Sequence, residues 1–265
     1  MIGGAWQRVD LQMSAFSSCL DYYSYLAYIS SDVPALLGVL RLSNKFDVPK
    51  LKLRALTHLE AHYPKDPLRH VTAPPSTAFP LLLPSPDHIH LSITAANIAR
   101  ETNTLTLLSP VLFACCSINP QSLVKTWQTH NHDNSSPPSG LTPENLYAVL
   151  KARNEITLFT RRHVFGSAFT SMDVPGCQTP EVCRRVRGEW AEAVEKDAEG
   201  REGWIDPLSP GSLLAKLARS ACVKCLERGK SDFLVGRRVL WERLPEIIGL
   251  SEWGRSEKRS SEGSP

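Results

Sequence analysis

Four cysteines in the second half of the chain have the residue type and spacing for metal chemistry. Cys177 and Cys183 form one pair, and Cys222 and Cys225 form a second. Four thiolates can close a tetrahedral zinc site, and the C-x-x-C spacing of the second pair is standard for zinc ligands, whereas the first pair is wider. We therefore predict a structural zinc site at these residues. Two alternatives stay open: ordinary buried thiols beside helix starts, or a redox pair at Cys222 and Cys225.

The remaining chemistry-bearing residues give no catalytic pattern. Adjacent Cys115 and Cys116 follow Leu112 and Phe113 in an apolar segment, which is typical of small core residues. The chain has no G-x-S-x-G nucleophile turn, no phosphate-binding glycine loop and no H-E-x-x-H zinc helix. We expect no enzymatic activity, and structural zinc is the one cofactor that the sequence indicates.

The composition and the net charge are typical of a globular protein. Of its 265 residues 42% are hydrophobic and 22% are charged, and the formal net charge is only +3. This charge gives no indication of nucleic-acid binding, and no apolar stretch reaches the length of a membrane span. The seven cysteines are an odd number, and we find no secretory signal before them. We expect reduced thiols and a location in the cytoplasm or the nucleus.

Apolar residues recur at helical spacing through most of the chain, which predicts a mainly α fold. Prolines and polar caps divide the pattern into separate helices, and Thr142 with Pro143 is the clearest helix start. Arg162–Thr170 is either a short strand or a loop. The predicted helices are Pro34–Leu42, Pro49–His62, Asp87–Glu101, Thr104–Ser117, one beginning at Pro143, Pro180–Lys196, Pro210–Glu227 and Asp232–Leu244. Thr104 is expected to cap its helix.

The densest aromatic and aliphatic cluster lies near the end of the chain, from Trp241 to Trp253. Two interpretations remain for it. These side chains either cap the helical core or form an exposed anchor for a partner protein.

The segment Gly38–Val48 and the following Leu51–Leu59 resemble the last helices of a BTB/POZ domain of the fungal, basidiomycete type. Ile98–Asn103 and Trp241–Leu250 resemble later segments of the same proteins, in the same order. The resemblance implies a protein-binding adaptor or regulator whose partners are other proteins. The fungal proteins are also similar to this chain in the arrangement of the four cysteines.

The resemblance also implies a domain organisation. Residues 33–70 would be the C-terminal helices of a BTB/POZ-like domain, followed by helical regions at 87–128 and 141–250. We expect residues 1–32 to be poorly ordered and 251–265 to be a disordered tail. Because most of the N-terminal BTB core does not precede these helices, we expect a truncated product or a misassigned first exon, without the usual BTB homodimer. The alternative function is a zinc-stabilised helical regulatory protein.

Overall fold

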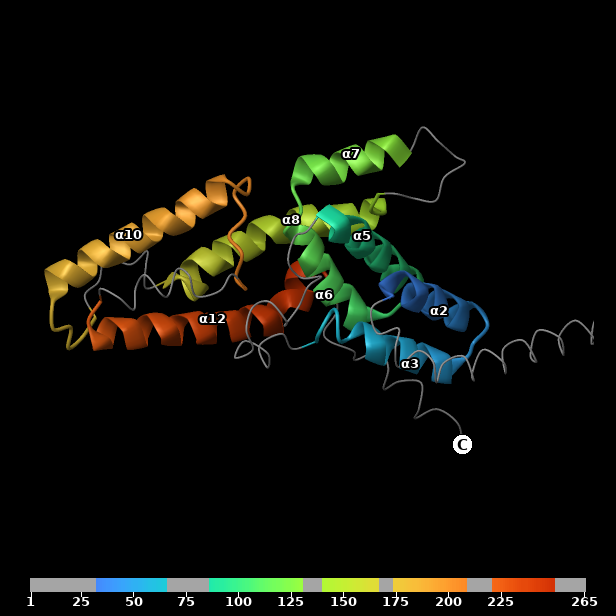
Figure 1. The fold of residues 1–265 in the computed structure, drawn as a ribbon, viewed down its shortest axis with the longest axis horizontal. Coiled ribbons are helices and arrows are strands. Elements are labelled where there is room, and N and C mark those ends of the chain that lie inside the picture. The colour runs from blue at the N-terminus through green and yellow to red at the C-terminus, as the bar shows by residue number, and fades with distance from the viewer. Residues whose placement is uncertain (1–31, 66–85, 131–139, 167–173, 209–220, 251–265) are drawn as a thin grey trace, which may run out of the picture. The chain divides into compact units, whose positions relative to one another are not determined.

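The structure, a computed structural model, is mainly α-helical, as the hydrophobic periodicity predicts. It describes residues 32–65, 86–130, 140–166, 174–208 and 221–250. These residues form 8 α-helices and one π-helical turn, with no strand among them (Figure 1). The chain divides into two compact units, Met1–His58 and Leu59–Pro265. Of the segments predicted to be poorly ordered, 1–32 and 251–265, all residues except Asp32 lie outside the described residues.

The first unit contains helix α2 (Val33–Lys45) and almost all of helix α3 (Pro49–Leu59). Asp32 caps α2 by accepting a hydrogen bond from the backbone N–H of Ala35, at 3.2 Å. The predicted helix ends are wrong by a few residues. The first helix continues to Lys45, because the backbone does not turn until Asp47, which has a φ of 51°. The second helix stops at Leu59 rather than His62.

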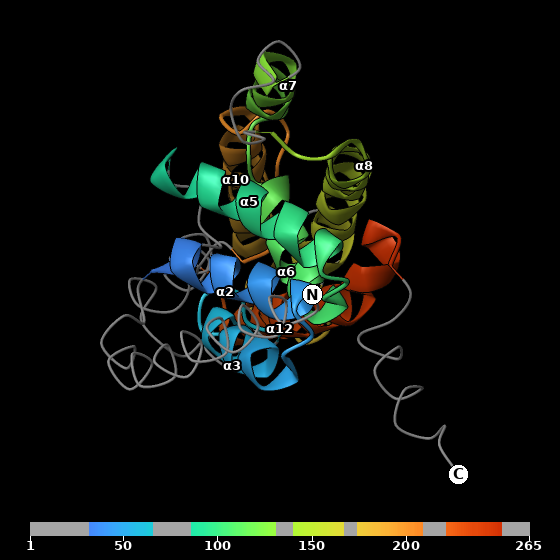
Figure 2. The same cartoon turned by 90° about the vertical axis from the view of Figure 1, so that its right-hand side faces the viewer.

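Helix α6 (Leu105–Cys116) forms the centre of the second unit, and its residues from Leu107 to Cys116 are all buried. It packs against α5 (Pro86–Glu101) and α8 (Pro143–Phe159) (Figure 2). Cys115 and Cys116 are fully buried, which confirms that they are core residues. Burial raises the pKa of Cys116 to about 12, so this thiol stays protonated at neutral pH.

The two predicted helix caps have different outcomes. Thr142 accepts a hydrogen bond from the backbone N–H of Asn145 and caps α8 as expected. Thr104 precedes α6 but makes no side-chain cap, so that prediction is wrong. Its hydroxyl instead lies 3.0 Å from the hydroxyl of Thr102, and this local hydrogen bond competes with capping.

Two further elements of this unit differ from the expectation. Helix α7 (Pro120–His130) begins inside the predicted helical region 87–128 and ends two residues beyond it, and the sequence predicts no separate helix after Ser117. Thr160–Val164 forms the π-helical turn η3, which extends α8 in place of the expected strand or loop. The hydroxyl of Thr160 donates to Ile156 O at 2.7 Å, and the Phe165 N–H donates to Thr160 O five residues earlier. Residues 167–170 lie outside the described residues.

The last two helices are α10 (Pro180–Glu199) and α12 (Val223–Ile248). The expected separation between Glu227 and Asp232 is wrong, because α12 runs through this segment as one helix with Gly229 buried. The predicted end at Leu244 is also wrong. Helix α12 continues through Pro245 and ends at Gly249, whose φ of 82° is the left-handed conformation of a C-terminal cap. Residues 210–220 of the predicted Pro210–Glu227 helix lie outside the described residues.

An aromatic cluster joins α10 and α12. Phe165, which follows η3, contacts Trp190 of α10 and Phe233 of α12, and each pair of ring centroids is 5.8 Å apart. Val186, Val194 and Ile205 complete this core cluster. The C-terminal cluster at Trp241 is likewise internal, since Trp241, Leu244, Ile247 and Ile248 are buried. This confirms the interpretation of these residues as part of the core, whereas Trp253 lies outside the described residues.

Candidate metal centre

Each cysteine pair stands at the beginning of a helix. Cys177 lies in a turn in which its N–H donates to Val174 O at 3.0 Å and Gly176 adopts a φ of 76°. Cys183 is in the first turn of α10, after Pro180, which suits that turn because it lacks an N–H. Cys222 is the N-cap residue of α12, and Cys225 is in its first turn. Two helix N-termini therefore lie at the same cluster of thiols.

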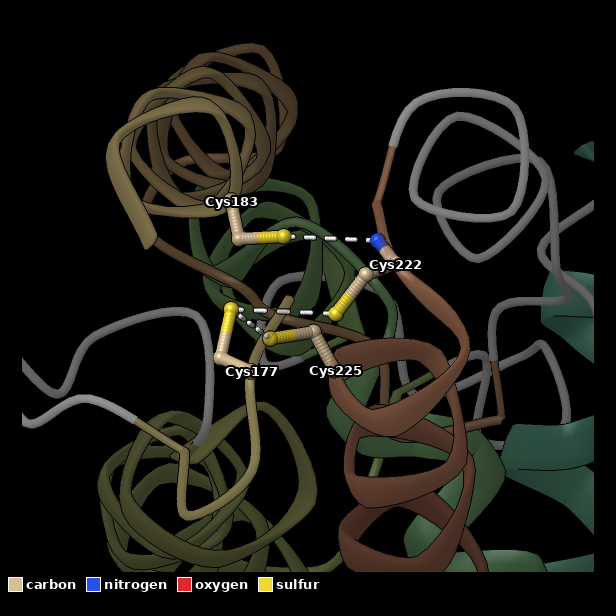
Figure 3. Close-up of side chains that lie close together, drawn as sticks. All are labelled: Cys177, Cys183, Cys222 and Cys225. Carbon is tan, nitrogen blue, oxygen red and sulfur yellow. Dashed lines mark hydrogen bonds between the residues drawn. The ribbon is translucent and has the colours of Figure 1, made fainter. Parts of the chain in front are cut away.

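The four sulfur atoms converge on one point (Figure 3). All of them lie within 4.8 Å of one another. Cys177 Sγ is 3.7 Å from Cys222 Sγ and 3.6 Å from Cys225 Sγ. In a regular tetrahedron with zinc–sulfur bonds of ~2.3 Å, neighbouring sulfurs are ~3.8 Å apart. The cluster therefore has the dimensions of a four-thiolate metal site, and these four residues could hold a metal ion.

Backbone N–H groups surround the sulfurs. The Cys222 N–H donates to Cys183 Sγ at 3.3 Å, and the Thr179 hydroxyl lies 3.4 Å from the same sulfur. Hydrogen bonds from the N–H groups of Cys225 and Gln178 lower the pKa of Cys222 to about 6. Burial raises the pKa of the Cys225 thiol. A bound cation would favour the thiolate at all four positions, because metal ligands must be deprotonated.

The electrostatic setting suits an anionic sulfur cluster. Four thiolates around a divalent cation leave a net negative charge, and the N-terminal ends of α10 and α12 carry the positive ends of their helix dipoles. Helix N-termini also favour the thiolate form of cysteine. The donor set, the sulfur spacing and the hydrogen bonds all fit a metal with sulfur ligands.

Burial divides the four cysteines into two classes. Cys183 and Cys225 are buried, whereas Cys177 and Cys222 are partly exposed. Four protein ligands fill a tetrahedral coordination sphere and leave no position for water or substrate, which is typical of structural zinc sites. Such a site can hold chain segments together, but it cannot activate a water molecule as a three-ligand zinc site does.

The structure brings together all four cysteines that the sequence indicates. The residues that support them are not predicted by the sequence: Gly176 forms the turn before Cys177, and Gln178 and Thr179 supply polar contacts to sulfur. The Thr179-Pro180 dipeptide does indicate a helix start just after Cys177. The contacts to Cys222 depend on the fold and have no sequence pattern of their own.

Comparison of the chain with protein-family models, with curated proteins and with solved structures finds no match. The resemblance to fungal BTB/POZ proteins therefore stays a prediction. The interpretation of the metal centre depends on its own geometry. Among the described helices, none combines the length and apolarity that crossing a membrane requires.

Proposed function

We propose that Cys177, Cys183, Cys222 and Cys225 bind a structural zinc ion, and that the chain is a non-catalytic helical regulatory protein built around it. The observation that carries this proposal is the approach of four sulfurs from two distant parts of the sequence to within 4.8 Å of one another. Sulfur ligands in a tetrahedral arrangement favour zinc among the common divalent metals of proteins.

The zinc ion would hold the start of α10 beside the start of α12. Away from the cysteines, α10 is held through the aromatic cluster of Phe165, Trp190 and Phe233. Zinc adds a second attachment at the end where each helix begins. Metal binding contributes about 10 kcal/mol or more to folding in small zinc domains, because the site does not exist in the unfolded chain.

Replacing Cys225 by serine tests the proposal. We expect the purified wild-type chain to contain one zinc ion per molecule by elemental analysis, and the Cys225→Ser chain to lose it. Amide exchange should then become faster around Cys177–Arg185 and in the first turns of α12, because the metal attachment between the two helix starts is gone. Exchange in α5, α6 and α8 should stay slow, because the core of these helices contains no ligand of the metal.

Cys115→Ala is the matched control. Cys115 is a buried cysteine of α6 outside the cluster, so its replacement should leave the zinc content unchanged. Full zinc content in Cys225→Ser, or equal loss of zinc in both variants, would contradict the proposal.

A second observation favours protein binding, the function that the BTB/POZ resemblance implies. Three apolar side chains on one side of α8 are exposed: Tyr147 at 72%, Leu150 at 39% and Leu158 at 38%, with the exposed polar Asn154 between Leu150 and Leu158. Positions 147, 150 and 158 fall on one side of a helix with 3.6 residues per turn. Apolar side chains exposed on one side of a helix can serve as contacts for another protein. We infer that this face of α8 binds a partner protein.

Photo-crosslinking in cells tests this inference. A benzophenone side chain at position 147 should form a discrete crosslinked product with another protein, and Leu150→Glu should reduce that product at least several-fold. The same probe at Glu199, an exposed position of α10, is the matched control and should give no such product. Equal products at both positions would contradict a binding role for α8.

A further inference from the structure

We propose that the metal centre is also a redox switch, in which hydrogen peroxide oxidises Cys177 and Cys222 to a disulfide and releases the zinc. This inference rests on the proposed zinc site and adds its regulation. It follows from two properties of the cluster: the short distance between these two sulfurs and the difference in exposure among the four ligands.

The geometry selects one reacting pair. Cys177 Sγ and Cys222 Sγ are 3.7 Å apart, so a covalent bond of ~2.05 Å requires a small movement of the turn around Cys177. Both residues are partly exposed, whereas Cys183 and Cys225 are buried. A peroxide arriving from solvent therefore meets Cys177 and Cys222 first. Cys225 lies at a similar distance from Cys177, but its burial shields it.

The chemistry balances with one peroxide molecule for each disulfide. One thiolate attacks a peroxide oxygen, the O–O bond breaks, and a sulfenic acid and a hydroxide ion form. The second thiolate then attacks the sulfenic sulfur, the S–S bond forms, and a second hydroxide leaves. Both hydroxides take protons from the buffer and become water. The sulfurs are oxidised by two electrons in total, and the peroxide is reduced to two water molecules.

Oxidation removes two of the four ligands from the metal. Cys183 and Cys225 remain, and two thiolates are too few for a structural zinc site. Before oxidation, Cys183 connects the start of α10 to the metal, and its sulfur also accepts a hydrogen bond from the Cys222 N–H at the start of α12. Loss of zinc thus frees the start of α10, while the aromatic cluster still holds the helix at Trp190. The switch alters one end of one helix and leaves the core intact.

Peroxide titration of the full zinc-loaded chain, with oxygen excluded, tests the switch. A chromogenic chelator measures released zinc, and alkylation followed by proteolysis and mass spectrometry locates the disulfide. Trypsin separates Cys222 from Cys225 at Lys224, and cleavage after Glu181 separates Cys177 from Cys183, so all pairings are distinguishable. We expect zinc release to rise in proportion to added peroxide, a Cys177–Cys222 disulfide, and recovery of zinc binding after a dithiol reductant and fresh zinc.

The other outcomes overturn the inference in different ways. Zinc that stays bound after peroxide, a disulfide that joins a different pair, or oxidation to sulfinic acid without a disulfide would overturn the switch alone. A chain that contains no zinc before peroxide is added would overturn the proposed zinc site and the switch with it. Cys115→Ala, treated in parallel, should release zinc as the wild type does, because Cys115 is buried away from the cluster.

Discussion

Gly236 is the residue that lets α12 pass close to the π-helical turn η3. A Cβ built at this position would overlap His163 O, and it would lie 2.6 Å from His163 C and 2.8 Å from Val164 Cα. All three neighbours are backbone atoms, so no side chain can rotate away. The crossing of α12 over η3 therefore depends on the absence of a side chain at residue 236.

Substitution of Gly236 by alanine should destabilise the chain. We expect the free energy of unfolding to fall by about 2–3 kcal/mol, because the two backbones must separate and their packing is lost. Chemical denaturation measures this change. The matched control is Gly188→Ala in α10, where nothing lies within 4 Å of the added Cβ. That variant should be more stable by about 0.5–1 kcal/mol, because alanine has the higher helix propensity. Equal effects of the two substitutions would show that the close crossing is wrong.

Arg153 is a buried structural residue that the sequence does not indicate. Its guanidinium is buried and donates hydrogen bonds to Ile118 O at 3.1 Å and to Arg201 O at 2.7 Å, and it lies over the Trp204 ring. It thereby connects α8 to the ends of α6 and α10. In the sequence, Arg153 stands within Lys151-Ala-Arg-Asn-Glu155 and has the pattern of a solvent-exposed helix face. Its hydrogen-bond acceptors are backbone carbonyls. Every residue type has one, so the sequence does not identify these acceptors.

At the scale of elements, helix boundaries are predicted well where the hydrophobic periodicity and the capping residues indicate the same position. The start of α8 is confirmed at Pro143 because Thr142, Pro143 and the apolar spacing all indicate the same boundary. Helix α10 begins at Pro180 as predicted and continues to Glu199, beyond the expected end at Lys196. These boundaries depend on local interactions, which the local sequence contains.

The errors in the predicted helix boundaries arise where tertiary packing overrides the local helix propensity of the sequence. Gly229 and Pro245 both disfavour a helix, yet α12 continues through them. Burial of Phe233, Leu240 and Leu244 along one side of α12 offsets these costs. The turn η3 similarly extends α8 because Val164 and Phe165 are buried against α10 and α12. Sequence alone does not show which apolar residues will meet.

At the scale of the whole molecule, the mainly α fold and the four candidate ligands could be predicted, but their convergence could not. The Cys222-x-x-Cys225 spacing places two sulfurs near each other at any helix start. The approach of Cys177 and Cys183 depends on where α10 packs, through contacts such as those of Trp190 with Phe165. The structure supplies this arrangement, in which all four sulfurs lie within 4.8 Å of one another.

X-ray absorption spectroscopy at the zinc edge, on the chain purified with its metal, tests the central claim most directly. The account predicts a first shell of four sulfur atoms at about 2.3 Å and no nitrogen or oxygen ligand, since four cysteines complete the tetrahedron. The Cys115→Ala chain should give the same spectrum, because Cys115 lies outside the cluster. A first shell that contains nitrogen or oxygen atoms, or a chain that binds no zinc, would contradict it.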